Sequence, residues 1–169
     1  MLPPHIEALN LSPDALRARA FAERAHGAQR YGENPYVVHL DDVVCLLVEC
    51  GRADLAVEGY LHDVAEDCPS FVAAMRREFP GAWPVVDACT GRGPNRKARN
   101  VSILRAIASK QDAQTVKAAD RGANMRAAAQ GVPDKLRMYR AEAVEFLRGI
   151  PLAPSSLRAI IEALVGVET

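Results

Sequence analysis

The sequence has few aromatic residues, no excess of charge of either sign and no long apolar run. Aromatic side chains make up 5% of the 169 residues while 49% are hydrophobic, which is typical of a core built mainly from Ala, Val and Leu in packed helices. Lys plus Arg and Asp plus Glu are equal at 21 each, so no overall field draws the chain to a nucleic-acid polymer or an anionic membrane. Apolar runs such as residues 43–48 are far shorter than the roughly 20 residues that span a bilayer. We therefore expect a soluble protein with no nucleic-acid polymer and no membrane as partner.

The cysteines and the first residues exclude two further classes of protein. Cys45, Cys50, Cys68 and Cys89 show no paired metal-binding spacing. The opening MLPPHIEALN lacks the basic start and the apolar stretch of a secretory signal. These features predict a reduced, cytoplasmic protein in which the cysteines are small buried residues. No thiol chemistry is expected, because the sequence places no identifiable base beside Cys68.

Helix signals recur along the whole chain. Ser12, Pro13 and Asp14 combine a cap, a tolerated proline and an acid at a helix start, and the helix is expected to reach about Gln29. Residues 31–35 (YGENP) are turn formers, and no strand alternation persists anywhere. Further helices are predicted over residues 41–49 (ended by Gly51), 54–64, 70–79, 83–90, 97–109, 114–128, 133–148 and 155–165. We predict an all-α fold with one domain over residues 1–150 and a C-terminal helix within 151–169 packed on it.

Residues capable of metal and acid-base chemistry are concentrated in GYLHDVAED, at the end of an apolar helix. They are His62, Asp63, Glu66 and Asp67. A single His-Asp pair is usually a surface pair or a helix end, but His39 and Asp120 also stand in apolar surroundings. Two imidazoles and two carboxylates suit a borderline or fairly hard divalent ion such as manganese, iron or zinc. Such an ion would acidify a water molecule and neutralise phosphate charge.

Three motifs in this order carry a family resemblance. Residues 25–39 (AHGAQRYGENPYVVH) match AH-x-x-Q-R followed by G and PY-x-x-H, residues 61–67 (LHDVAED) match LHD-x-x-ED, and residues 116–124 (VKAADRGAN) match VK-x-AD-R-x-x-N. Together they resemble the HD-domain hydrolases of the RelA/SpoT kind, specifically the stand-alone small alarmone hydrolases. The resemblance covers the chain from about Ala18 to Tyr139. It implies a compact HD-domain helical bundle that removes the 3′-pyrophosphate of ppGpp or pppGpp, giving GDP or GTP and pyrophosphate.

The resemblance also implies roles for individual residues. It makes the metal ligands His39, His62, Asp63 and Asp120, with manganese as the usual ion. It makes Glu66 and Asp67 the pair that positions and activates the attacking water. It implies that Arg30 holds substrate phosphate or base, that Asn124 lies near the ribose, and that Tyr139 lines the pocket.

The chain departs from the family pattern at Tyr31, where a second basic residue is usual. A tyrosine can stack on a nucleobase but cannot form an ion pair with phosphate, so Tyr31 is expected to shift recognition toward the base. From Gly91 to Gln111 the chain carries six basic residues and no acid. Arg96 and Lys97 are the best candidates there for a phosphate contact, although a solvated helix face also fits such a run.

Two alternatives to a ppGpp hydrolase stay open. The same site could act on an adenosine alarmone or on the 2′-phosphate of NADPH, and the identity of the product separates these substrates. A non-catalytic nucleotide-binding module could also keep the fold, although the presence of Glu66 and Asp67 argues against it. The sequence leaves the oligomeric state open, a homo-oligomer included.

Overall fold

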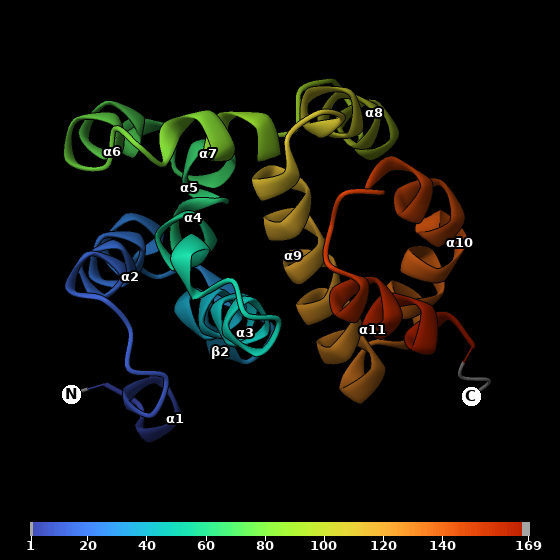
Figure 1. Cartoon of the computed structure of the whole chain (residues 1–169), viewed down its shortest axis with the longest axis horizontal. Helices are drawn as coiled ribbons and strands as arrows, with labels where there is room; N and C mark the ends of the chain where they lie inside the picture. Colours follow the sequence, from blue (N-terminus) through green and yellow to red (C-terminus); the bar gives the residue numbers. More distant parts are fainter. Residues whose placement is uncertain (1, 167–169) are drawn as a thin grey trace.

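The chain folds almost entirely into helices, which confirms the predicted all-α class (Figure 1). The structure is a computed structural model that describes residues 2–166. The elements are α1 (Pro4–Glu7), α2 (Pro13–His26), β1 (Arg30–Tyr31), β2 (Asn34–Pro35), α3 (Tyr36–Glu49), the 3₁₀ helix η1 (Ala53–Leu55), α4 (Ala56–Leu61), α5 (Val64–Asp67), the 3₁₀ helix η2 (Pro69–Phe71), α6 (Val72–Glu78), α7 (Trp83–Cys89), α8 (Arg96–Ile107), α9 (Gln111–Gly131), α10 (Pro133–Gly149) and α11 (Ser155–Gly166). Among these residues no helix combines the length and apolar character needed to cross a membrane.

Local signals fix several helix ends where the sequence predicts them. The Ser12 hydroxyl accepts the backbone N–H of Ala15 at 3.2 Å and so caps α2. Asn95 caps α8 in the same way, since its side chain accepts the N–H of Ala98 at 2.9 Å. Gly51, directly after the C-cap of α3, has φ +78°, a conformation that glycine adopts without steric cost.

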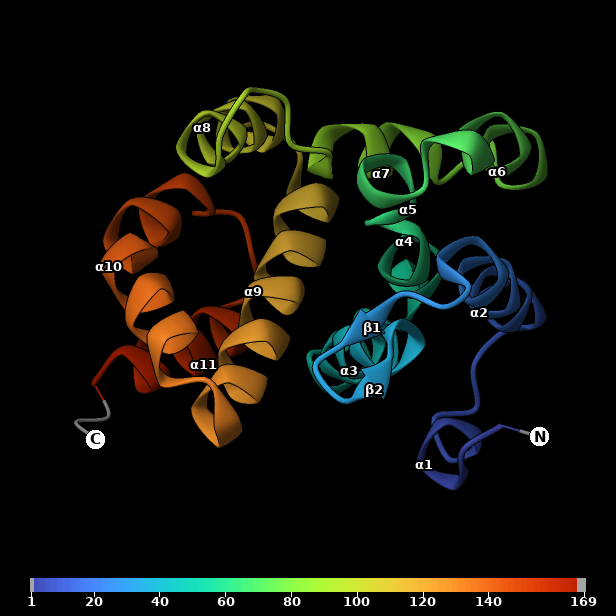
Figure 2. The same ribbon diagram turned by 180° about the vertical axis from the view of Figure 1, so that it is seen from behind.

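Helix α3 and the segment before it differ from the sequence expectation. Helix α3 begins at Tyr36 rather than at residue 41, because Pro35 occupies its N-cap and burial of Val37 and His39 outweighs the weak helix propensity of the β-branched start. The expected turn segment 31–35 overlaps the two-residue strands β1 and β2, which pair as a small antiparallel hairpin beside α3 (Figure 2).

The predicted helix over residues 54–64 is divided. It consists of η1 and α4, and regular helix resumes only in α5, so that His62 and Asp63 stand in the break. Side chains of neighbouring residues diverge on an uninterrupted helix. The break therefore allows His62 and Asp63 to face one point.

The core consists of two apolar clusters that share α3. One cluster includes Leu47 of α3, Met125 of α9 and Ile161 of α11. The other includes Val44 of α3 together with Phe21 of α2 and residues of α4. Helices α3 and α9 pack side by side, which places the interior of the domain between them (Figures 1 and 2).

The C-terminal helix α11 lies against α9 and α10. Leu157 and Ile161 of α11 are fully buried in the same apolar cluster as α9. Residues 167–169 of the expected C-terminal appendage lie outside the described residues. Helix α11 thus packs against α9, the helix that carries Asp120.

Candidate metal centre

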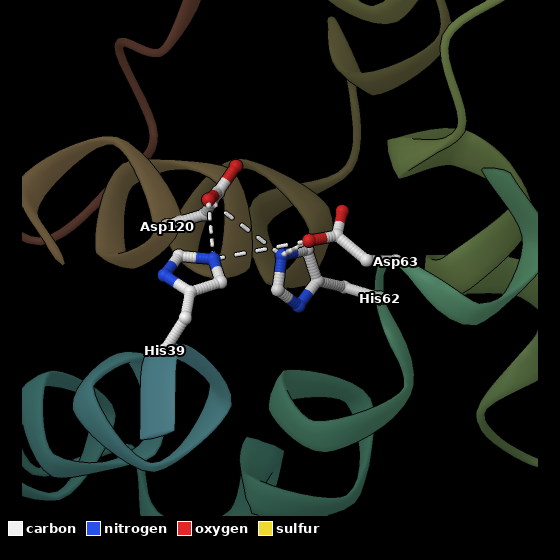
Figure 3. Close-up of side chains that lie close together, drawn as sticks. All are labelled: His39, His62, Asp63 and Asp120. Atoms are coloured by element: carbon white, nitrogen blue, oxygen red, sulfur yellow. Dashed lines mark ion pairs between the residues drawn. The ribbon is translucent and has the colours of Figure 1, made fainter. Parts of the chain in front are cut away.

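Two imidazoles and two carboxylates converge between α3, the α4–α5 break and α9 (Figure 3). The four residues are His39, His62, Asp63 and Asp120. Each offers one ligand atom, and these atoms all lie within 4.8 Å of one another. Nε2 of His39 lies 3.3 Å from Oδ1 of Asp120, and Nε2 of His62 lies 3.1 Å from Oδ2 of Asp63. A mixed nitrogen and oxygen set of this kind can hold a divalent metal ion.

The hydrogen bonding of His62 fits a metal ligand. Nδ1 of His62 lies 2.8 Å from the carbonyl oxygen of Gly59, and a proton on Nδ1 directs the lone pair of Nε2 into the cluster. Nε2 is fully buried and has no hydrogen-bond partner among the described residues. A buried polar atom without a partner is costly, and an ion at the centre of the cluster would satisfy it.

Neighbouring side chains hold the two carboxylates of the cluster. The hydroxyl of Tyr36 donates a 2.7 Å hydrogen bond to Oδ2 of Asp63. The ammonium of Lys117 lies 2.5 Å from Oδ2 of Asp120, one turn along the same helix. Nδ2 of Asn124 donates to Oδ1 of Asp120 at 2.5 Å. Outer partners of this kind commonly orient metal ligands.

The electrostatics of the cluster favour charged side chains despite burial. Burial opposes a charge on His62, but Asp63 and Asp120 outweigh it and raise the pKa of His62 to about 10. Burial also opposes ionisation of the carboxyls, yet His62 keeps the pKa of Asp63 below its usual range, and Lys117 does the same for Asp120. The two carboxylates thus favour a positive charge within the cluster, carried either by a protonated His62 or by a bound metal ion.

The cluster lies in the wall of a cavity of about 230 Å³. Helices α3, α5, α8, α9 and α10 contribute lining residues. Besides the cluster, the charged residues that line it are Glu66, Asp67, Arg96, Arg99, Lys117, Arg121, Glu142 and Glu145. Four of these are cationic. The cavity therefore contains positive charges that can bind an anionic molecule, in addition to its carboxylates.

Glu66 and Asp67 both line this cavity, next to Asp63. Oε1 of Glu66 lies 3.4 Å from Nε of Arg99 on α8. Oδ2 of Asp67 accepts a 2.9 Å hydrogen bond from the side-chain amide of Gln29. Their carboxylates are therefore tethered beside the cluster and are placed to accept protons there.

The structure brings some of the expected substrate residues to the cavity and leaves others outside it. Arg96, Asn124 and Tyr139 line the cavity. Arg30 is exposed and donates instead to a carbonyl oxygen of its own hairpin. Lys97 is exposed on the outer face of α8, where it lines a separate shallow groove. One helix position separates Lys97 from Arg96, and that rotation is enough to turn Lys97 away.

Tyr31 lies behind the cluster and not among the described residues that line the cavity. Its ring stacks on the imidazole of His39, with 4.6 Å between the ring centroids. Its hydroxyl donates a 2.7 Å hydrogen bond to Oδ1 of Asn124. The side chain expected to meet the nucleobase thus contacts His39 of the candidate metal site and Asn124 beside it.

Sequence reasoning missed part of the cavity wall. Glu142 of α10 accepts from Arg96 at 2.7 and 3.0 Å and from Arg121 at 2.9 Å, so the wall contains a carboxylate held between two guanidinium groups. Arg99 also lines the cavity. Its spacing of three residues from Arg96 in the basic run is a signal for a shared helix face. No comparable local signal points to Glu142.

The expectation that Cys68 has no neighbouring base is wrong. Nδ1 of His26 lies 3.5 Å from Sγ of Cys68, a pairing that only the tertiary structure creates. Burial nevertheless raises the pKa of the Cys68 thiol to about 11, so the thiol stays protonated near neutral pH. Cys68 and Cys89 are buried as expected, whereas Cys45 and Cys50 are only partly buried.

A comparison of the chain with protein-family models gives no match, and neither does a comparison with curated proteins. The resemblance to HD-domain hydrolases thus depends on the three motifs alone. The geometry of the cluster and its cavity is what supports a function for this chain.

Proposed function

We propose that this chain is a metal-dependent phosphohydrolase that removes the 3′-pyrophosphate of ppGpp or pppGpp. The observation that carries the proposal is the convergence of His39, His62, Asp63 and Asp120 in the wall of a cavity that also presents four further carboxylates and four cations. His39, His62, Asp63 and Asp120 would hold the ion, and manganese is the ion that the family resemblance implies. When bound, such an ion supplies a Lewis acid and lowers the pKa of a bound water.

The chain's own residues can accept the proton that hydrolysis releases and can offset negative charge at the cavity wall. Glu66 and Asp67 lie beside the cluster, where one carboxylate accepts a proton from the attacking water and the other orients that water. Arg99 offsets negative charge at the same wall. Lys117 stays protonated, because Asp120 outweighs the effect of burial on its pKa, and so holds Asp120 in place.

The other side of the cavity supports a nucleotide as substrate. Arg96 and Arg121 present guanidinium groups that lie 5.2 and 4.7 Å from the ring centroid of Tyr139. Guanidinium groups bind phosphate oxygens, and the buried ring of Tyr139 packs against both of these groups and so helps to hold them at the cavity wall. A nucleotide that carries a pyrophosphate would thus place its reacting phosphate at the cluster and its other groups against α8 and α10.

One observation favours the same chemistry on a different nucleotide. Arg30 and Lys97, two of the expected phosphate contacts, lie outside the cavity. Fewer cations are then available for a long polyphosphate than the motifs alone suggest. NADPH, whose reacting group is a single 2′-phosphate, is therefore the second candidate for the substrate; an adenosine alarmone carries the same phosphates as ppGpp and differs from it only in the base.

Product analysis tests both candidates. The purified chain is loaded with Mn²⁺ and incubated with ppGpp, its adenosine counterpart and NADPH, and the products are identified by ion-exchange chromatography. We expect pyrophosphate and GDP from ppGpp, with Asp63→Asn inactive and Lys97→Ala as active as wild type. If none of the three nucleotides yields a metal-dependent product, the proposed function is wrong.

A further inference from the structure

Tyr31 contacts one residue of the cluster directly and a second one through Asn124, with different parts of its side chain. Its ring stacks on the imidazole of His39, with 15° between the ring planes. Its hydroxyl donates to Oδ1 of Asn124, and Nδ2 of Asn124 donates in turn to Oδ1 of Asp120. One side chain of the hairpin thus reaches a ligand residue on α3 directly and a ligand residue on α9 through a single amide.

The side-chain oxygen of Asn124 accepts hydrogen bonds only from other protein groups. Oδ1 accepts from Tyr31 at 2.7 Å and from Tyr139 at 3.1 Å, which fills both of its acceptor positions. Nδ2 donates to the carboxylate of Asp120 and to its backbone carbonyl. The opposite orientation of the amide would turn its oxygen toward the Asp120 carboxylate. The two tyrosine hydroxyls therefore favour the orientation that holds Asp120.

The stacking contact with Tyr31 helps to orient the imidazole of His39. Nδ1 of His62 lies beside a backbone carbonyl, but among residues 2–166 no hydrogen bond holds Nδ1 of His39. His39 is only 2% exposed, so its imidazole is oriented by the contact of Nε2 with Asp120 and by the rings packed against its faces and edges. Tyr31 lies parallel to it, and Tyr36 meets it edge to face at 5.7 Å.

The surroundings of Tyr31 argue against a role as a platform for a nucleobase. The ammonium of Lys135 lies 5.0 Å from its ring centroid, and the ring is also in contact with His39. Its hydroxyl is bound to the side-chain oxygen of Asn124 at 2.7 Å. Both functional parts of the side chain are thus occupied by protein groups.

We propose that Tyr31 is a positioning residue of the metal centre, which orients His39 through its ring and Asp120 through Asn124 and thereby raises the affinity for a divalent ion. This inference rests on the proposed metal centre and extends it by one outer residue. Loss of such outer partners typically weakens metal binding by about 10-fold to 100-fold. A residue that only contacted substrate would leave metal affinity unchanged.

Metal affinity of the full chain is the measurement that tests this role. Wild type, Tyr31→Phe and Tyr31→Leu compete with a fluorescent chelator for Mn²⁺ and, separately, for Zn²⁺. The matched control is Tyr60→Phe, which removes a buried hydroxyl that bonds Asp41 at 3.1 Å and that, among the described residues, forms no hydrogen bond with the cluster. We expect the dissociation constant to rise about 10-fold in Tyr31→Phe and toward 100-fold in Tyr31→Leu, with Tyr60→Phe like wild type.

The outcomes separate this inference from the proposed reaction. Weaker metal binding in both Tyr31 variants supports the positioning role even when no nucleotide is hydrolysed. Unchanged metal affinity in a folded Tyr31→Leu overturns it, and a raised KM in the same variant would assign Tyr31 to substrate instead. A wild-type chain that binds neither ion overturns the metal centre and this inference together.

Discussion

The backbone N–H of Gly91 donates a 2.9 Å hydrogen bond to Oε2 of Glu66, at the wall of the cavity beside the His/Asp cluster. A Cβ on residue 91 would lie 2.8 Å from Cβ of Arg99 and 3.2 Å from that same carboxylate oxygen. The loop after α7 therefore approaches Glu66 closely only because residue 91 has no side chain. Backbone and guanidinium together fix the carboxylate that is expected to activate water.

Gly91→Ala should lower turnover while metal content stays at the wild-type level. The added methyl group displaces Arg99 or Glu66, and a misplacement of about 1 Å in a reacting group can cost on the order of 10²-fold in rate. Steady-state kinetics and metal analysis of the purified variant provide the test. Gly81→Ala is the matched control, since nothing lies within 4 Å of a Cβ there. Equal turnover in the two variants would contradict this role of Gly91.

Glu66→Gln should keep the metal and lose turnover. Glutamine retains the size of the side chain and a carbonyl oxygen that can accept the N–H of Gly91, but it cannot take a proton from water. We expect kcat to fall on the order of 10²-fold or more, the usual contribution of a positioned acid-base group. An unchanged rate would assign Glu66 to structure.

Asp120→Ala and Asp63→Asn should lose metal and activity together. Each variant removes one of the two carboxylates of the cluster, and metal affinity depends on the ligand set and its charge. We expect metal binding to weaken by more than the roughly 100-fold that loss of an outer partner can cause. Asp87→Ala is the control, because Asp87 forms only a surface ion pair with Arg92. Full metal content in either folded cluster variant would refute the site.

Metal binding should release a proton near neutral pH. Asp63 and Asp120 outweigh burial and raise the pKa of His62 to about 10, so the metal-free chain carries a proton on His62 that a metal ion must displace. Apparent affinity should therefore increase as the pH rises, by up to about tenfold per pH unit below the His62 pKa. Titration calorimetry in buffers of different ionisation enthalpy counts the released protons. Affinity that does not change between about pH 7 and 9 would show that His62 is neutral before the ion binds.

The sequence by itself determined the fold class and the residue types of the site. Helix caps such as Ser12 depend on atoms only a few positions away, so backbone geometry and local hydrogen bonds decide them without help from the rest of the chain. The motifs also contain His39, the His62-Asp63 pair and Asp120, which the structure brings together.

Only the tertiary structure decided how these side chains are directed. Packing of α3 against α9 brings His39 and Asp120 together, and the break between α4 and α5 turns His62 and Asp63 toward the same point. Contact of the β1–β2 hairpin with α3 places Tyr31 against His39, and the orientation of α8 leaves Lys97 outside the cavity. The physical reason is that a side chain's direction depends on the whole set of contacts between distant helices, and a rotation of one helix position is enough to change it.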